Sequence, residues 1–155
     1  MNPVNFSKLT RSIRYQGVIL RNDYILLIQH REHAGGRSYW LLPGGGREDG
    51  ETEEQCVLRE MKEETGLDVK VERLLMDEPE HPGGGYQRHK TYLCAILTGE
   101  AQPGYEPEPE VAAQYSIAEV GWYNLRNEAS WGEKITSDPF TYPEMKRIQA
   151  VLEIS

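Results

Sequence analysis

Alternating runs of apolar and polar residues divide the first part of the chain into short strands. Two β-rich runs cover residues 13–20 and 24–30, and Arg21-Asn22-Asp23 between them predicts a hairpin. The glycine-containing segment 31–38 is expected to be a mobile loop. An apolar run at residues 39–42, ended by a proline, predicts one more short strand.

The next segment has the periodicity of a helix, predicted over residues 53–65. Thr52 is a suitable N-cap, and Gln55 completes a capping box with it. Gly66 stands where a left-handed residue commonly ends a helix. Apolar residues at 57, 58 and 61 form a stripe that is expected to pack on a sheet.

Strand character returns over residues 69–76, 90–98 and 119–125. The run at 90–98 is apolar on both faces, which is typical of a central strand. Residues 102–110 are rich in proline and glutamate and are expected to form an exposed loop. A C-terminal helix is expected to start near Pro143, with Met145, Ile148 and Leu152 on one face.

This order of elements predicts an α/β (α+β) fold with a mixed sheet, arranged as an α/β/α sandwich. The length of 155 residues fits a single domain over residues 1–155. No apolar run approaches the roughly 20 residues of a membrane span, and the N-terminus has no secretory core. We therefore expect a cytoplasmic protein with no membrane partner.

Charge and composition narrow the classes of partner. The net charge of −8 disfavours nucleic acid as a partner, whereas a small polyanion can still bind through bridging metal ions. Cys56 and Cys94 lie far apart without Cys-x-x-Cys spacing, so a reduced pair of core residues is expected. The four histidines are scattered and are expected at the surface or in loops: His30, His33, His81 and His89.

Three glutamates of the predicted helix suggest a metal site. Glu60, Glu63 and Glu64 share one stripe of the helix, where like charges at this spacing destabilise it. Hard divalent cations would offset that repulsion, and Mg²⁺ characteristically binds a few carboxylates together with substrate phosphate. The alternative is a solvated acidic face, since glutamate is a good helix former. The glycines that follow Pro43 can bring backbone close to a ligand.

The spacing around these glutamates resembles the signature of the Nudix (MutT-like) hydrolase family, G-x5-E-x7-R-E-U-x-E-E-x-G-U, where U is a bulky aliphatic residue. The segment from Gly45 to Leu67 matches every fixed position. The resemblance implies a loop–helix–loop motif on a mixed sheet between helices. It also implies hydrolysis of a diphosphate bond with Mg²⁺, for which Mn²⁺ is a substitute.

The same resemblance implies a role for each motif residue. Glu60 and Glu64 would be the main metal ligands, with Glu63 as a ligand or water-positioning carboxylate and the Gly44 carbonyl as a further ligand. These three glutamates are the expected catalytic residues. Arg59 would pair with Glu51, and Gly45 and Gly66 would satisfy backbone geometry. A general base would come from a separate loop; the candidates are Glu106, Glu108, Glu110 and Glu119.

The expected substrate is a small nucleotide, a nucleoside diphosphate joined to another group. Pro82 lies 15 residues beyond Leu67. A proline about this far downstream resembles the ADP-ribose branch of the family, which favours ADP-ribose or a nucleotide sugar. Tyr86 resembles the branch that hydrolyses dinucleoside polyphosphates, and a pyrophosphohydrolase for damaged (d)NTPs is a further alternative. Arg31, Tyr86 and Pro82 are candidate substrate contacts. A non-catalytic nucleotide-binding Nudix module is the rival class, although no motif glutamate is missing. A homodimer is a family expectation.

Overall fold

The computed structural model describes residues 12–79, 86–106 and 109–154 of the chain. Its strands are β1 (Ile13–Arg21), β2 (Tyr24–Glu32), β3 (Ser38–Leu41), β4 (Gly44–Gly45), β5 (Asp68–Pro79), β6 (Arg88–Thr98) and β7 (Tyr115–Asn124). Its helices are α2 (Glu53–Thr65), α3 (Pro109–Ala112), the 3-10 turn η1 (Glu128–Ser130), α4 (Glu133–Thr136) and α5 (Thr141–Val151).

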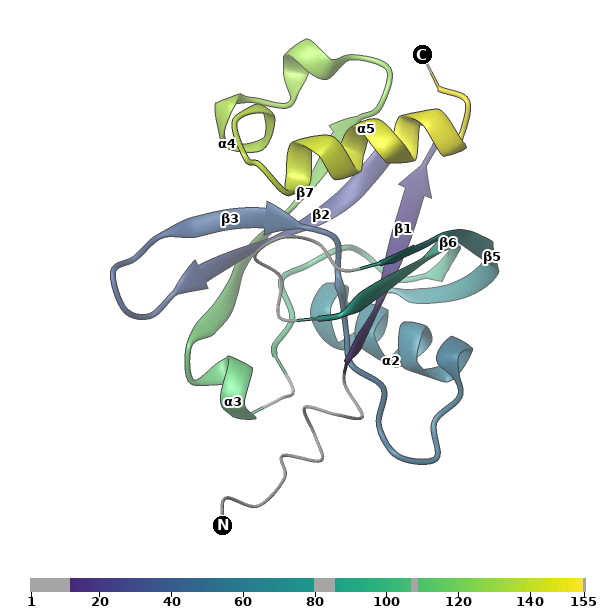
Figure 1. Cartoon of the computed structure of the whole chain (residues 1–155), viewed down its shortest axis with the longest axis vertical. Coiled ribbons are helices and arrows are strands. Elements are labelled where there is room, and N and C mark those ends of the chain that lie inside the picture. Colours follow the sequence, from purple (N-terminus) through teal and green to yellow (C-terminus); the bar gives the residue numbers. More distant parts are fainter. Residues whose placement is uncertain (1–11, 80–85, 107–108, 155) are drawn as a thin grey trace.

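The strands form a mixed sheet in the order β3-β2-β1-β6-β5, with β4 paired to β1 and β7 paired to β2 (Figure 1). The β1–β6 pair is parallel, whereas the β1–β2, β2–β3, β2–β7 and β5–β6 pairs are antiparallel. The prediction of a mixed sheet is confirmed, and β6 is a central strand as its two-sided apolar pattern indicated.

Strands β1 and β2 are paired over only a short stretch. The register joins Leu20 to Ile25 and Arg21 to Tyr24, next to the predicted hairpin turn. Beyond that point β1 pairs with the two-residue strand β4, while β2 continues between β3 and β7. Figure 1 shows β1 and β2 diverging from the hairpin. Arg14 and Gln16 of β1 and His30 of β2 line a cavity in this region.

Helices cover both faces of the sheet, and the alternation of side chains along β1 shows how. Val18 packs in a core cluster with Met145 and Ile148 of α5. Its neighbour Ile19 belongs to the opposite cluster, which contains Val57 and Met61 of α2. Because successive residues of a strand point to opposite faces, the two clusters are separated by the sheet. The expected α/β/α arrangement is therefore present.

Helix α2 has the predicted bounds because both of its ends are determined locally. The Gln55 backbone N–H donates to Thr52 Oγ1 at 3.1 Å, and the Thr52 N–H donates to the Gln55 side-chain oxygen at 2.9 Å. Gly66 ends the helix in the left-handed conformation (φ 77°), and its N–H donates to the Lys62 carbonyl. A side chain at Gly66 would be strained in this conformation.

Other expectations need correction. The loop expected over residues 31–38 is shorter, because β2 extends to Glu32 and β3 begins at Ser38. The segment between β7 and α5 contains two short helices, η1 and α4, which the sequence pattern did not predict. Cys56 and Cys94 are buried and free, as predicted. Within the described part of the chain, no helix combines the length and apolar character that a membrane crossing requires.

Candidate functional site

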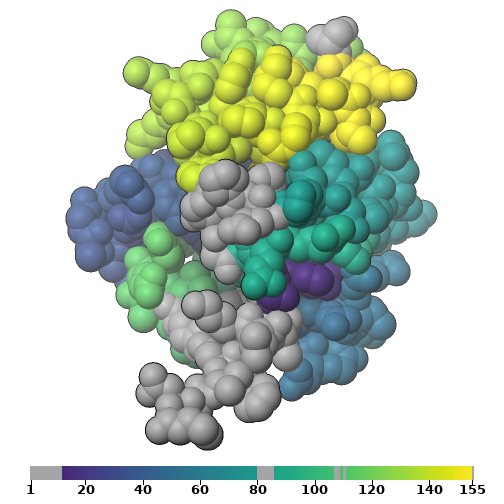
Figure 2. Space-filling model, viewed as in Figure 1, coloured from purple at the N-terminus to yellow at the C-terminus, as the bar shows by residue number. Residues whose placement is uncertain are grey.

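A cavity of about 650 Å³ lies where β1 and β2 diverge, bounded on one side by the start of α5. Its walls come from segments that are distant in sequence and include Arg14, His30, Tyr39, Tyr86, Glu106 and Phe140. Figure 2 shows one face of the molecule, with the C-terminal helix at the top and the β2–β3 and β5–β6 segments to the left and right below it. The glycine strand β4 forms part of the cavity wall.

Glu64, in the last turn of α2, is completely buried beside this glycine strand. Its Oε1 atom accepts a hydrogen bond from the Gly44 N–H at 2.7 Å. Its Oε2 atom is buried and has no hydrogen-bond partner among the described residues. Burial, Glu60 and Glu106 together raise the pKa of Glu64 well above its usual range. A divalent cation beside Oε2 would satisfy this atom and offset the repulsion, so the residues present fit a metal ion.

The Arg59 side chain binds the other glutamates of the motif. Its Nε and Nη2 atoms donate to the two oxygens of Glu51 at 2.6 and 2.9 Å, and Nη2 also donates to the Gly46 carbonyl at 3.0 Å. Its Nη1 atom lies 2.9 Å from Glu60 Oε1 and 3.1 Å from Glu63 Oε2. The Arg59–Glu51 pair implied by the family resemblance is thus present, and it lowers the pKa of Glu51.

Gly45 is positioned against the Glu60 carboxylate. A Cβ atom added at Gly45 would lie 2.5 Å from Glu60 Oε1, closer than side-chain carbons approach in proteins. The absence of a side chain at residue 45 therefore allows the Glu60 carboxylate to pack directly on the backbone of β4.

Residues 101–106, here called the docked loop, pack against the C-terminal end of α2. The N–H groups of Gly104 and Tyr105 donate to the Glu64 and Glu63 carbonyls, each at 3.0 Å. The Gln102 N–H donates to the Thr65 carbonyl at 2.9 Å. These bonds satisfy carbonyls that have no partner within the helix. The expectation of a wholly exposed loop is therefore wrong for this part of 102–110.

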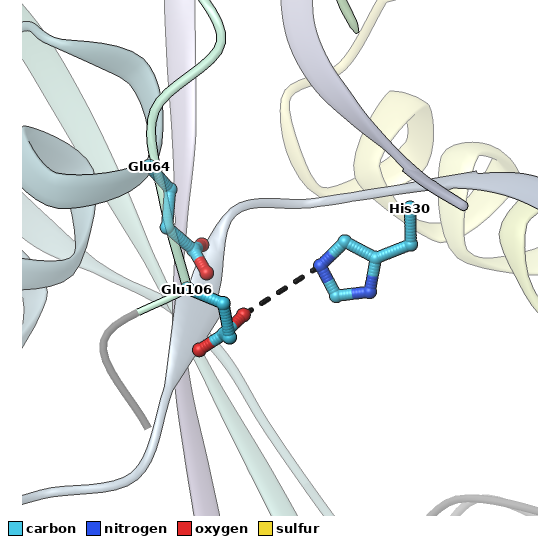
Figure 3. A group of neighbouring side chains, drawn as sticks. All are labelled: His30, Glu64 and Glu106. Carbon is cyan, nitrogen blue, oxygen red and sulfur yellow. Dashed lines mark ion pairs between the residues drawn. The ribbon is translucent and has the colours of Figure 1, made fainter. Parts of the chain in front are cut away.

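The docked loop delivers Glu106 to the cavity, where its side chain is only 7% exposed. One ligand atom each of His30, Glu64 and Glu106 lie within 4.8 Å of one another (Figure 3). His30 Nε2 is 3.8 Å from Glu106 Oε2. Burial, followed by the charge of Arg14, lowers the pKa of His30 to about 4, so the ring is neutral at pH 7.

Two histidines therefore differ from the sequence expectation. His30 and His89 were expected at the surface or in loops, but they are 6% and 8% exposed. Both line the cavity. His30 is buried because its ring packs against Tyr39 and Tyr115 and lies beside Glu106.

Arg14 lines the cavity from β1 and is held by hydrogen bonds on two sides. Its Nε atom donates to Gln16 Oε1 at 3.2 Å, and Nη2 donates to the Leu42 carbonyl at 2.7 Å. Gln16 is buried and its amide donates to Thr91 and Glu144, both at 2.9 Å. Burial opposes the charge of Arg14, but Tyr86 and the nearby carboxylates outweigh burial and raise its pKa. This arrangement presents a fixed positive charge to the cavity.

The remaining sequence candidates are dispersed. Tyr86 lines the cavity. Arg31 is exposed on β2 and Glu119 is exposed on β7, and neither is among the residues that line the cavity. Glu110 lies in the short helix α3. Pro82 and Glu108 are outside the described residues.

Sequence reasoning missed His30 and Arg14. A signal for His30 was available, because it lies two residues beyond the uninterrupted apolar run of residues 25–28. Such a run indicates a strand covered on both faces, where a histidine near its end is expected to be shielded from solvent. No comparable signal existed for Arg14, whose neighbours in space come from distant segments.

Comparison with known proteins gives a consistent picture. A family model described as NUDIX domain matches residues 12–141. An ADP-ribose pyrophosphatase from Methanocaldococcus jannaschii is 36% identical over 95 residues, which cover 60% of this chain and 56% of that protein. An 8-oxo-dGTP diphosphatase from Proteus vulgaris is 47% identical over 77 residues, which cover 50% of this chain and 64% of that protein.

The aligned segments thus cover less than two thirds of these relatives, and only 28% of a relative from Caenorhabditis elegans. Among solved structures, an ADP-ribose pyrophosphatase from Streptococcus suis superposes with a TM-score of 0.63. It is 24% identical, and the alignment covers 91% of this chain and 89% of that one. This likeness shows that the two chains share a fold.

Proposed function

Because this chain belongs to the Nudix hydrolase family, we propose that it hydrolyses the diphosphate bond of a nucleoside diphosphate linked to another group. The observation that carries the proposal is the buried Glu64 carboxylate at the glycine strand. One of its oxygens is bound by the Gly44 N–H, and the other is buried without a hydrogen-bond partner in the described residues. A carboxylate in this state is suited to bind a divalent cation.

Mg²⁺ is the proposed cation, with Mn²⁺ as a substitute. Glu60 and Glu64 would hold it, together with the Gly44 carbonyl and with Glu63 as a ligand or water-positioning carboxylate. The ion would neutralise the diphosphate and lower the pKa of a bound water. Arg59 holds Glu60 and Glu63 beside Gly46, so these carboxylates are positioned before substrate binds.

Glu106 is the candidate base that the structure favours over the other three. It is the only one of the four whose described side chain lines the cavity, and it is close to Glu64. A carboxylate in this position can accept a proton from the water that attacks phosphorus. The docked loop places it there through backbone bonds to α2.

Arg14 is proposed to bind the substrate phosphates. Two of its five N–H donors are used by Gln16 and Leu42, which fixes the plane of the guanidinium. An arginine held in this way pairs well with a phosphate and stabilises negative charge on the leaving group. Because Arg14 lies near the carboxylates that would hold the metal ion, the phosphates of the substrate, and not its nucleoside, would bind at this end of the cavity.

ADP-ribose or a nucleotide sugar is the preferred substrate. The Methanocaldococcus relative is named for ADP-ribose, and the cavity volume is within the range of roughly 300–1,000 Å³ typical of small-molecule sites. Tyr39, Tyr86 and Phe140 offer aromatic surfaces for a base. A damaged dNTP is the second candidate, because the Proteus relative is named for 8-oxo-dGTP.

A substrate panel tests the proposal. ADP-ribose, nucleotide sugars, dinucleoside polyphosphates, dNTPs and oxidised dNTPs would be incubated with the full chain and Mg²⁺ or Mn²⁺, and the products separated by anion exchange. We expect a nucleoside monophosphate from at least one compound and none in the presence of EDTA. Nucleotide binding without turnover of any compound would support a non-catalytic module instead. The cytoplasmic location, the homodimer and the absence of a nucleic-acid partner remain predictions from the sequence.

A further inference from the structure

His30 carries an imidazole that is buried beside two carboxylates. The ring stacks on Tyr115 with centroids 5.6 Å apart and meets Tyr39 edge-on at 5.7 Å. These contacts fix its orientation, and Figure 3 shows one ring nitrogen directed at Glu106. That nitrogen, Nε2, is buried and has no hydrogen-bond partner within the part of the chain that the structure describes.

Two buried polar atoms without a partner belong to side chains that meet beside the cavity. His30 Nε2 and Glu64 Oε2 both lack a hydrogen-bond partner among the described residues, and one ligand atom from each of His30, Glu64 and Glu106 lies within 4.8 Å of the other two. Leaving a buried polar atom unsatisfied costs about 1–3 kcal/mol. One cation bound between these side chains would satisfy both atoms and neutralise the two carboxylates.

The spacing of the three ligand atoms suits a single ion. With bonds of about 2.1 Å, ligands in adjacent octahedral positions are about 3.0 Å apart and opposite ones about 4.2 Å apart. His30 Nε2 and Glu106 Oε2 are 3.8 Å apart, and the three side chains each offer a ligand atom within 4.8 Å of the other two. Small side-chain rotations would close this group around an ion.

We propose that His30 is a metal ligand, forming with Glu64 and Glu106 a mixed nitrogen–oxygen site that prefers Mn²⁺ to Mg²⁺. The inference deepens the proposed function and rests on it for the presence of a catalytic metal. Mg²⁺ favours an all-oxygen environment, whereas imidazole raises affinity for first-row transition metals. One oxygen of Glu106 binds this ion, and the other can still accept a hydrogen bond from the attacking water.

Coordination is tested directly by pulsed electron paramagnetic resonance of Mn²⁺ bound to the full chain. We expect modulation from a coordinated histidine ¹⁴N nucleus, replaced by the ¹⁵N pattern when histidine is isotopically labelled. His30→Phe keeps the stacked ring but removes the nitrogen, so the signal should disappear. His33→Phe is the matched control, because His33 is exposed three residues further along the chain, and its spectrum should equal that of the parent.

Affinity provides a second readout. Titration of free Mn²⁺ should show Kd about tenfold or more weaker in His30→Phe, with a much smaller change for Mg²⁺ measured by calorimetry. Absence of histidine coupling in the parent chain overturns the proposal, as does an equal loss of Mn²⁺ and Mg²⁺ affinity. If His30→Phe fails to fold, the spectrum of the labelled parent chain still shows whether a histidine nitrogen is bound to Mn²⁺.

The same measurements separate the inference from the proposed function. Histidine coupling in a chain that hydrolyses nothing would support the metal site and contradict the proposed hydrolase activity. Turnover with Mg²⁺ or Mn²⁺ but no histidine coupling would support the hydrolase activity and contradict the histidine-containing metal site. In that case the His30 ring is a packing element of the Tyr39–Tyr115 cluster.

Discussion

Replacing Gly104 with alanine is expected to move the docked loop away from α2. The added Cβ would lie 1.8 Å from the Glu63 carbonyl oxygen, and because that atom belongs to the helix backbone it cannot rotate aside. Real Cβ contacts are essentially never shorter than 3.0 Å, so the loop must shift by at least 3.0 − 1.8 = 1.2 Å. Such a shift breaks the backbone bonds from Gly104 and Tyr105 to the helix.

The magnitude follows from these two bonds. Each is worth about 1 kcal/mol, so the free energy of unfolding should fall by about 2 kcal/mol. For a chain of this length that corresponds to a decrease in Tm of roughly 4–8 °C. Glu106 is two residues further along and should move with the loop, and a displacement of about 1 Å in a catalytic group can lower kcat about 100-fold.

Thermal unfolding followed by circular dichroism measures the first effect, and turnover of the preferred panel substrate measures the second. Gln102→Ala is the control, because the Gln102 side chain is exposed while its bond to Thr65 uses the backbone. It should change Tm by less than about 2 °C, as surface substitutions usually do. A Gly104→Ala protein with unchanged Tm and kcat would refute the docking of this loop on the helix.

Three further outcomes are expected. Glu64→Gln should lower kcat by orders of magnitude while the protein stays folded. In EDTA, the free energy of unfolding of the parent should fall as pH rises above the ordinary carboxyl range, because the raised pKa of Glu64 favours its protonated form when folded. Urea titrations of the variant should show a free energy of unfolding that depends less on pH. Arg59→Lys should lower the free energy of unfolding, measured by urea titration, by about 1–2 kcal/mol, since a lysine cannot bridge both oxygens of Glu51 and the Gly46 carbonyl; an unchanged free energy of unfolding would contradict this role. Arg14→Gln should raise KM about 10–100-fold by loss of a charged hydrogen bond to phosphate, and steady-state kinetics with unaltered KM would exclude that contact.

The helix of the site could be predicted to the residue, because its limits depend on neighbours in sequence. Thr52 and Gln55 form the N-terminal cap and Gly66 the C-terminal one, so three positions within one segment determine the element. The spacing of the glutamates on its surface was equally local. These features did not require knowledge of the sheet.

The other half of the site depends on tertiary contacts. Glu106 could not be separated from three other glutamates by sequence, because its position follows from backbone bonds between its loop and the end of α2. His30 was expected at the surface, and its burial results from Tyr39, Tyr115 and Glu106, which come from other strands and from the docked loop. The helices before α5 were missed because each has only three or four residues, too few to show periodicity.

The parallel pairing of β1 with β6 has a consequence for the order of events during synthesis. Ile13 pairs with Arg88, so the two partners are separated by 88 − 13 = 75 residues. At a synthesis rate of about 5–20 residues per second, roughly 4–15 s pass between the appearance of the two strands. Helix α2 carries its own caps and can form early, but β4 is held by β1, which completes its pairing only when β6 emerges. The motif glutamates of α2 are therefore made first and assembled late, and a nascent chain that stops before β6 should hold these glutamates without Glu106 and without the complete pocket.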